Sequence, residues 1–438
     1  MQSGFRVVKK SKTRKIFYAG VMLLFALIFA RNVLQIGLPA LGFLALFLFL
    51  AFICDKNEMM ALAVLCIPLN SSLQYKYALL GWMFIYFLRF EKDIRFTTAI
   101  LPLLAMLIWE GLHVFLDFDF SILEYVRGFA ELIFCTFLML NKFRDYDKGF
   151  ILRTLAVGTV FVCCSVFLIL VREVGFDISK IFFGSYRFGQ IENNYNFNMN
   201  FNPNGLGFIC NLSIAGIFHV VSTEKRKWFD WPLLLALAVF GVMTMSRTFL
   251  ICFVLIVSAY FLSGQGLGIK KRGKRLLLLL VLFGIMVYVL LRFMPTVVEK
   301  FIGRFLEDDV SNGRNDLLSF YNWVIFEHPR NTFFGLGMQN VSDKVFEWYD
   351  YMINVPHNGP QQLVVVWGVM GLILFAWFII ALIKSARQRN KFDFISFIPL
   401  FFVLINVMSG QLITAGHVLL SFSVVFIIMS KKKERKNG

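Results

Sequence analysis

Long apolar runs recur along almost the whole chain of 438 residues and limit what it can fold into. Each is roughly 17–20 residues long, which is enough for one α-helix to cross the hydrocarbon core of a bilayer. Within that core every backbone polar group must be hydrogen-bonded by the protein itself, and helices achieve this. Only 16% of the residues are charged, against about a quarter in soluble domains. The sequence therefore predicts an all-α polytopic membrane protein with about 12–14 transmembrane helices.

The predicted spans cover about residues 16–32, 37–54, 58–70, 74–90, 97–116, 121–140, 150–171, 204–222, 230–246, 248–263, 276–293, 360–383, 394–410 and 412–430. The third run is short for a spanning helix, and a re-entrant segment is the alternative there.

Two long polar stretches, 172–203 and 294–359, interrupt this series and suggest a division of the chain. We expect an N-terminal transmembrane bundle with an Asn-rich loop over residues 1–203. A central region with the long loop follows over 204–383. A C-terminal transmembrane hairpin and a basic tail complete the chain over 384–438.

The net charge of +17 is distributed in a way that predicts the topology. Lys and Arg gather in the N-terminal tail, in alternate loops and in the C-terminal tail, as the positive-inside rule requires. Both termini are then cytoplasmic, and the two long polar stretches face outward. Because cationic loops of this kind bind lipid headgroups, we expect membrane lipids as partners and no nucleic acid.

The seven Cys are scattered and show no metal-type spacing, so we expect neither a metal site nor a cofactor bound through them. The first apolar run lacks a small-residue cleavage site, which argues against a cleavable signal peptide.

Arginines next to or inside apolar runs are the first candidates for chemistry, because ionisable groups are costly in a membrane. Arg247 lies between two runs without a partner nearby in the sequence. An outward-facing Arg at that level suits a phosphate group, while snorkelling to the headgroups is the alternative. Arg127 lies inside a predicted span between Glu124 and Glu131, at spacings of three and four. This favours an intrahelical salt-bridge set over a functional role for Arg127.

The long loop contains the remaining candidates. Arg314 precedes an amphipathic run, Asn315–Phe326, that predicts a helix. A helix start beside an Arg is a natural anion site, and a surface Arg on an interfacial helix is the alternative. His357 and Asn358 precede the next span. An imidazole titrates near neutral pH, so His357 is the best candidate for a general base, the alternative being a polar residue near a helix cap.

The other histidines carry less weight. His113, His219 and His417 fall inside predicted spans, and we expect packing or hydrogen-bonding roles for them. No second ligand stands at metal-binding spacing from His357, so no metal site is expected in the loop.

A series of short motifs runs from about residue 185 to residue 380. In chain order they are Arg187, Asn202-Pro203-Asn204, Ser246-Arg247-Thr248, Gly313-Arg314, Pro329, Phe334-Gly335-Leu336-Gly337, Pro356-His357-Asn358 and the glycine-containing run from Gln362 to Leu372. Their order and predicted topology resemble those of the O-antigen ligase and polysaccharide-repeat polymerase superfamily.

The resemblance implies a class-C-like glycosyltransferase built of membrane helices, with one large extracytoplasmic loop and no metal, nucleotide sugar or other cofactor. Such an enzyme takes a glycan from an undecaprenyl-pyrophosphate donor and joins it to an acceptor hydroxyl on the outer leaflet of the cytoplasmic membrane. By the same resemblance, Arg247 and Arg314 bind the pyrophosphate, and His357 activates or positions the acceptor hydroxyl. Further substrate-binding candidates are Arg187, Asn204, Arg127 and Asn358.

Three functions stay open at this point. A polymerase of repeat units is favoured, because a ligase that acts on lipid A core needs an outer membrane. Ligation to lipid A core or to a protein is the second function. A lipid-glycan flippase or transporter is the third, and it predicts inverted repeats, broken helices and ionisable residues in mid-membrane. A chain-length regulator and a flippase of the same pathway are candidate partners of a polymerase.

Overall fold

Helices make up all the regular structure in the part of the chain that the computed structural model describes. That part comprises residues 13–70, 75–94, 96–116, 147–176, 202–224, 226–262, 314–327, 329–338, 358–386, 394–408 and 416–430, with short pieces and single positions between them. The elements over the first half of the chain are α1 (Arg14–Asn32), α2 (Ala40–Ile53), α3 (Lys56–Leu65), α4 (Tyr75–Phe90), η1 (Glu91–Asp93), α5 (Ile100–Leu116), α6 (Ile122–Tyr125) and α8 (Lys148–Val174). The elements that follow are α10 (Pro203–Thr223), α11 (Asp230–Met243), α12 (Arg247–Leu262), α15 (Arg314–Glu327), α16 (Pro329–Phe334), α18 (Gly359–Ala386), α19 (Phe394–Met408) and α20 (Gly416–Met429).

Four of the described helices, α1, α8, α10 and α18, are long and apolar enough to cross a membrane, and six shorter helices are also apolar. This confirms the predicted all-α class with several membrane-type helices. The total of about 12–14 spans stays a prediction, as do the division of the chain at residues 203 and 383 and the orientation of the termini.

The short third run folds differently from a span. Its helix, α3, ends at Leu65, whereas the predicted span continued to about residue 70. A helix of this size is roughly 15 Å long, too short to cross a bilayer. All of its residues from Glu58 to Leu65 are buried, so α3 packs entirely inside the bundle.

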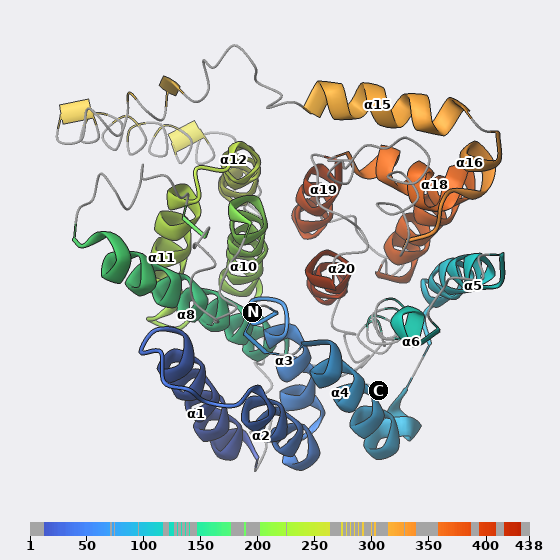
Figure 1. Cartoon of the computed structure of the whole chain (residues 1–438). Helices are drawn as coiled ribbons and strands as arrows, with labels where there is room; N and C mark the ends of the chain where they lie inside the picture. The colour runs from blue at the N-terminus through green and yellow to red at the C-terminus, as the bar shows by residue number, and fades with distance from the viewer. Residues whose placement is uncertain are drawn as a thin grey trace, which may run out of the picture.

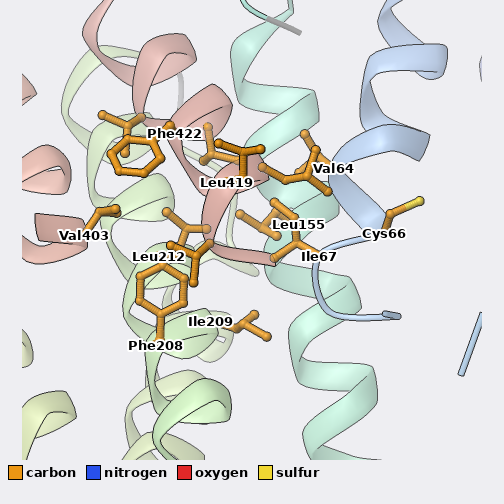
Figure 2. Close-up of a cluster of buried hydrophobic side chains, with 14 of the residues drawn as sticks. Val64, Cys66, Ile67, Leu155, Phe208, Ile209, Leu212, Val403, Leu419 and Phe422 are labelled. Carbon is orange, nitrogen blue, oxygen red and sulfur yellow. The ribbon is translucent and has the colours of Figure 1, made fainter. Parts of the chain in front are cut away.

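The core lies where α3, α8, α10, α19 and α20 meet (Figure 1). Figure 2 shows side chains from all of these elements gathered into one cluster, with α20 supplying Leu419 and Phe422. α10 is almost wholly buried, because its sequence is apolar on every side and it can be covered all round. It is therefore the central helix of the part of the bundle that positions the site.

Side-chain contacts define two ends of this bundle. The Arg14 end contains the starts of α1, α3, α8 and α11. There Arg14 binds Glu58 and Asp147, and the residue after α10, Glu224, accepts a hydrogen bond from the backbone of Gly149 in α8. The Arg247 end lies at the opposite end of α10, where α10 and α12 start. The 21 residues of α10 separate the two ends by roughly 32 Å, which is close to the thickness of a hydrocarbon core.

Candidate functional site

The turn between α11 and α12 holds Arg247 at a helix start. Met245 has a φ of 53°, a left-handed conformation that is uncommon for a residue with a side chain. Ser246 caps α12, because its Oγ accepts a hydrogen bond from the backbone N–H of Phe249 at 3.3 Å. Arg247 is consequently the first residue of α12 and is half-buried. The first backbone N–H groups of the helix point away from its body and have no partner within it.

The start of α10 packs directly against this turn. Asn202 caps α10 by accepting a hydrogen bond from the backbone of Asn204 at 2.9 Å, and Pro203 occupies the first helical position, which Pro favours. A side chain at Gly207 would lie 3.0 Å from Phe249 Cβ, so glycine allows the close approach of α10 to α12. The structure thus brings the Asn-Pro-Asn and Ser-Arg-Thr motifs together, although they are far apart in the sequence.

A buried hydrogen bond fixes the same contact one turn further along. Asn211 of α10 donates from Nδ2 to the carbonyl of Phe249 in α12 at 3.1 Å. Because this amide is fully buried, the bond holds the two helices in one register.

The start of α18 is tied to α15. Asn358 caps α18 by accepting from the backbone N–H of Gln361 at 3.3 Å. The side chain of Gln361 in turn donates to the carbonyl of Leu318 at 2.7 Å and to Asn322 Oδ1 at 3.0 Å, both in α15. The helix predicted over Asn315–Phe326 is confirmed by α15 and is therefore docked on the start of α18.

α19 connects this start of α18 to α12. A side chain at Gly359 would collide with the carbonyl oxygen of Val407 near the end of α19. One residue earlier, Asn406 Nδ2 lies 3.7 Å from Cys252 Sγ of α12. The end of α19 therefore touches both the helix that Arg247 opens and the helix that Asn358 caps, and the start of α18 belongs to the Arg247 end.

The predicted site residues share one structural setting wherever their backbone is described. Arg247 opens α12, Arg314 opens α15, Asn204 lies in the first turn of α10 and Asn358 caps α18. The side chain of Arg314 lies outside the described residues, as do three other candidates, which are Arg187, Arg127 and His357. The roles predicted for all seven stay predictions.

Helix starts have an electrostatic consequence for this end of the bundle. The partial positive charge of a helix N-terminus favours an anion by about 0.3–1 kcal/mol and disfavours a nearby cation. α12 and α15 nevertheless both open with arginine. An anion that binds both the guanidinium and the helix N–H groups reverses this penalty, so the arrangement suits a phosphate or pyrophosphate.

α15 itself is held by burial of one face. Tyr321, Val324 and Ile325 are buried, in agreement with the amphipathic pattern of the sequence. Burial raises the pKa of Tyr321 to about 12, so its hydroxyl stays protonated at neutral pH. Tyr321 is therefore a packing residue of the α15 contact rather than a base.

A network around α5 was not predicted from the sequence. The buried carboxylate of Glu110 accepts from the indole N–H of Trp367 in α18 at 2.6 Å and from the backbone of Met338 at 3.0 Å. The available signal was an acidic residue inside a predicted span, but this argument was applied to Arg247 and Arg127 and not to Glu110. The hydrogen-bonding role expected for His113 is confirmed, because its Nε2 lies 2.9 Å from the carbonyl of Phe334.

α18 is broken at the point where this network touches it. Gly368 has a φ of 67° and interrupts the helix. The backbone of Leu336 donates to the carbonyl of Val365 at 2.8 Å, and that of Gly337 donates to Val366 at 2.9 Å. The Phe-Gly-Leu-Gly motif therefore folds into the break in α18 and satisfies carbonyls that a continuous helix would use.

Comparison with known proteins gives one match. Residues 232–376 match the family described as O-antigen ligase, a range of about one third of the chain that runs from α11 through the first half of α18. The match confirms the predicted resemblance to the O-antigen ligase and polymerase superfamily. Neither the curated proteins nor the solved structures give a match. Together with the apolar helices, the match supports a multi-pass membrane protein that is similar to the O-antigen ligase family over this range.

Proposed function

We propose that the chain is a metal-independent membrane glycosyltransferase that polymerises undecaprenyl-pyrophosphate-linked repeat units into a cell-surface polysaccharide. The product is an O-antigen, a capsule or an exopolysaccharide, made on the outer leaflet of the cytoplasmic membrane. One observation carries the proposal. The O-antigen ligase match over residues 232–376 spans the starts of α12, α15 and α18, which are the helix starts that carry Arg247, Arg314 and Asn358.

The reaction requires little from the protein besides charge stabilisation. The acceptor hydroxyl oxygen attacks the anomeric carbon of the donor glycan, and the bond from that carbon to the pyrophosphate oxygen breaks. Undecaprenyl pyrophosphate leaves with the electron pair. Arg247 and Arg314 stabilise the negative charge that develops on the departing phosphate, and the N–H groups at the starts of α12 and α15 add to this stabilisation.

The remaining task is removal of one proton from the acceptor hydroxyl. His357 directly precedes Asn358 in the chain, and in this proposal its imidazole takes that proton as a general base. Asn358 supports this role because it caps a helix start that α15 and α19 hold from two sides. Arg187, Asn204 and Arg127 are proposed as further contacts to the substrate.

The test is reconstitution of the purified protein in vesicles with a lipid-pyrophosphate-linked repeat unit. A ladder of longer glycans is expected. Arg247→Ala, Arg314→Ala and His357→Ala should each reduce the ladder by about 100-fold or more while leaving membrane insertion intact. Arg330→Ala is the matched control, because Arg330 is an exposed arginine of α16 next to α15. Full activity in all three variants would refute the assigned roles.

The same assay separates the alternatives. Transfer only to lipid A core or to a protein acceptor, without a ladder, identifies a ligase. The broken helix α18 and the buried carboxylate Glu110 are features that transporters use, so a flippase is kept as a third function. Translocation of the lipid-linked unit without any new glycosidic bond would identify it. A chelator is expected to leave the ladder unchanged, and a chain-length regulator and a flippase of the same pathway are proposed partners.

A further inference from the structure

The first piece of α18, Gly359–Trp367, is a separate short helix about 13 Å long. It begins at the Asn358 cap and ends at the break at Gly368. Its start belongs to the Arg247 end, where α15 and α19 hold it. Whatever fixes its other end therefore also sets the position of Asn358.

That other end is fixed by α5. Trp367 is the last residue before the break, and α5 holds its indole N–H and its backbone carbonyl. The indole N–H of Trp367 donates to Glu110 Oε2 at 2.6 Å, and its carbonyl accepts from Trp109 Nε1 at 3.0 Å. Both Glu110 and Trp367 are buried, where hydrogen bonds to a charged group are strong.

The segment Phe334–Met338 completes the contact between α5 and α18. Leu336 and Gly337 donate to carbonyls of α18, and Met338 donates to Glu110. The ring of Phe334 also stacks on Trp109 with centroids 5.6 Å apart. We call this set of residues the α5 brace. It consists of Trp109, Glu110 and His113 of α5, the segment Phe334–Met338, and Trp367 and Gly368 of α18.

His113 has an unusual pair of neighbours within the brace. Its Nδ1 lies 3.0 Å from the carbonyl of Trp109, and its Nε2 lies 2.9 Å from the carbonyl of Phe334. A carbonyl oxygen only accepts, whereas a neutral imidazole has a single N–H. Both contacts are therefore hydrogen bonds only when both ring nitrogens carry a proton.

Glu110 is the charged neighbour of His113 among the described residues of the brace. Glu110 lies one helical turn earlier on α5, at a spacing at which side chains of opposite charge attract. Tyr125 of α6 points its hydroxyl at the carbonyl of Leu107, and the side chain of its neighbour Glu124 lies outside the described residues. Phe334–Met338 and Gly359–Trp367 contain no charged residue, so the described brace holds one carboxylate and one imidazole.

We propose that Glu110 and His113 are positioning residues, which hold the first piece of α18 through Trp367 and Phe334 and so set the place of Asn358 at the site. The proposal rests on the proposed function for its effect on the reaction, but the brace itself is testable without any glycan. Their contacts lie at the far end of the first piece of α18, so in this proposal both act on the geometry of the reaction rather than on binding of the pyrophosphate.

The first measurement is thermal unfolding of the purified protein in nanodiscs. Glu110→Leu and His113→Leu leave buried polar groups without partners and should lower the midpoint by roughly 5 °C or more. Glu110→Gln and His113→Gln keep one acceptor and one donor respectively, so they should recover most of the loss. His219→Leu replaces a histidine of α10 outside the brace and is the matched control. Equal midpoints for His113→Leu and the wild type would overturn the brace.

The second measurement is steady-state polymerisation by the same variants. Glu110→Leu and His113→Leu should lower kcat by roughly 10- to 100-fold with the KM for the lipid-linked donor unchanged. A raised KM with an unchanged kcat would place the brace in donor binding and overturn the positioning role. If the wild type forms no ladder, the proposed function fails, while the thermal measurements still decide whether the brace exists.

Discussion

The helix starts at the two ends of the bundle differ in their balance of charge. At the Arg14 end, Asp147 caps α8, Asp230 opens α11 and Glu58 lies in the first turn of α3, while Arg14, which opens α1, binds Glu58 and Asp147. At the Arg247 end, α12 opens with arginine and has no acidic residue in its first turn, and α15 opens with arginine and has Asp316 in its first turn. Carboxylates neutralise the positive ends of helices from within the chain, whereas arginines increase the positive potential there. The comparison indicates that the charges of the Arg14 end serve folding, whereas an anionic ligand at the Arg247 end is part of the proposed function.

The largest effect on stability is expected at the Arg14 end. Arg153 of α8 binds Asp230 through two hydrogen bonds, of 2.7 and 2.9 Å, and both residues are buried. Arg153→Ala leaves the buried carboxylate unpaired and should cost about 3–5 kcal/mol of unfolding free energy, measured by SDS titration in mixed micelles. The double variant Arg153→Leu/Asp230→Leu removes both charges and should recover much of this loss. An unchanged free energy of unfolding in Arg153→Ala would contradict the comparison.

The second prediction makes the Arg247 end resemble the Arg14 end. Arg247→Glu places a carboxylate at the start of α12, so stability should stay equal or rise by about 0.3–1 kcal/mol. Polymerisation should fall by about 100-fold or more, because the phosphate then meets a negative charge. The stability of Arg247→Gln should lie between those of the wild type and Arg247→Glu, and its activity should be nearly as low as that of Arg247→Glu. A marked loss of stability in Arg247→Glu would instead assign Arg247 a structural role.

The third prediction concerns the packing of the start of α18 on α19. Gly359→Ala adds a methyl group that collides with the carbonyl of Val407, and such overpacking costs about 1–3 kcal/mol. Because the start of α18 must move, kcat should fall as well, which steady-state assays can measure. Gly42→Ala in α2, where nothing lies within 4 Å of the added carbon, is the control and should be active. An unaffected Gly359→Ala would show that α18 need not touch α19.

The smallest effect is expected at the cap of α12. Ser246→Ala removes the hydrogen bond to the backbone of Phe249 and should lower the unfolding free energy by about 1 kcal/mol, while Ser246→Gly should lower it by only a few tenths. Activity should decrease in the same order, since a frayed first turn displaces Arg247. If both variants lose activity without any loss of stability, the hydroxyl of Ser246 contacts the substrate directly.

The sequence predicts the helices well because the length of an apolar run is by itself enough to indicate a membrane helix. The spans predicted over 150–171 and 204–222 correspond to α8 and α10, whose bounds differ by only a few residues. The run of α3 was predicted as a span, with a re-entrant segment as the alternative, because burial inside a protein and burial in lipid select the same apolar residues. The distinction depends on length, which is marginal for a run of this size.

The candidate site is predictable in part, for a similar reason. Asn202, Ser246 and Asn358 each cap a helix in the structure, and their residue types are ones that sequence rules favour at helix starts. The α5 brace is not predictable in this way, because Glu110 binds residues that are 228 and 257 positions away. The break at Gly368 likewise depends on contact with the carbonyl of Phe333, which no local pattern encodes.

The burial of α10 has a consequence for how the protein responds to different membranes. α10 is covered by other helices along nearly its whole length, whereas α1 and α18 expose many side chains. A bilayer that is thicker or thinner than the protein acts on the lipid-facing helices, which adjust by tilting. The distance between the Arg14 end and the Arg247 end is set by α10. We therefore expect this distance to stay the same in bilayers of different lipid chain length.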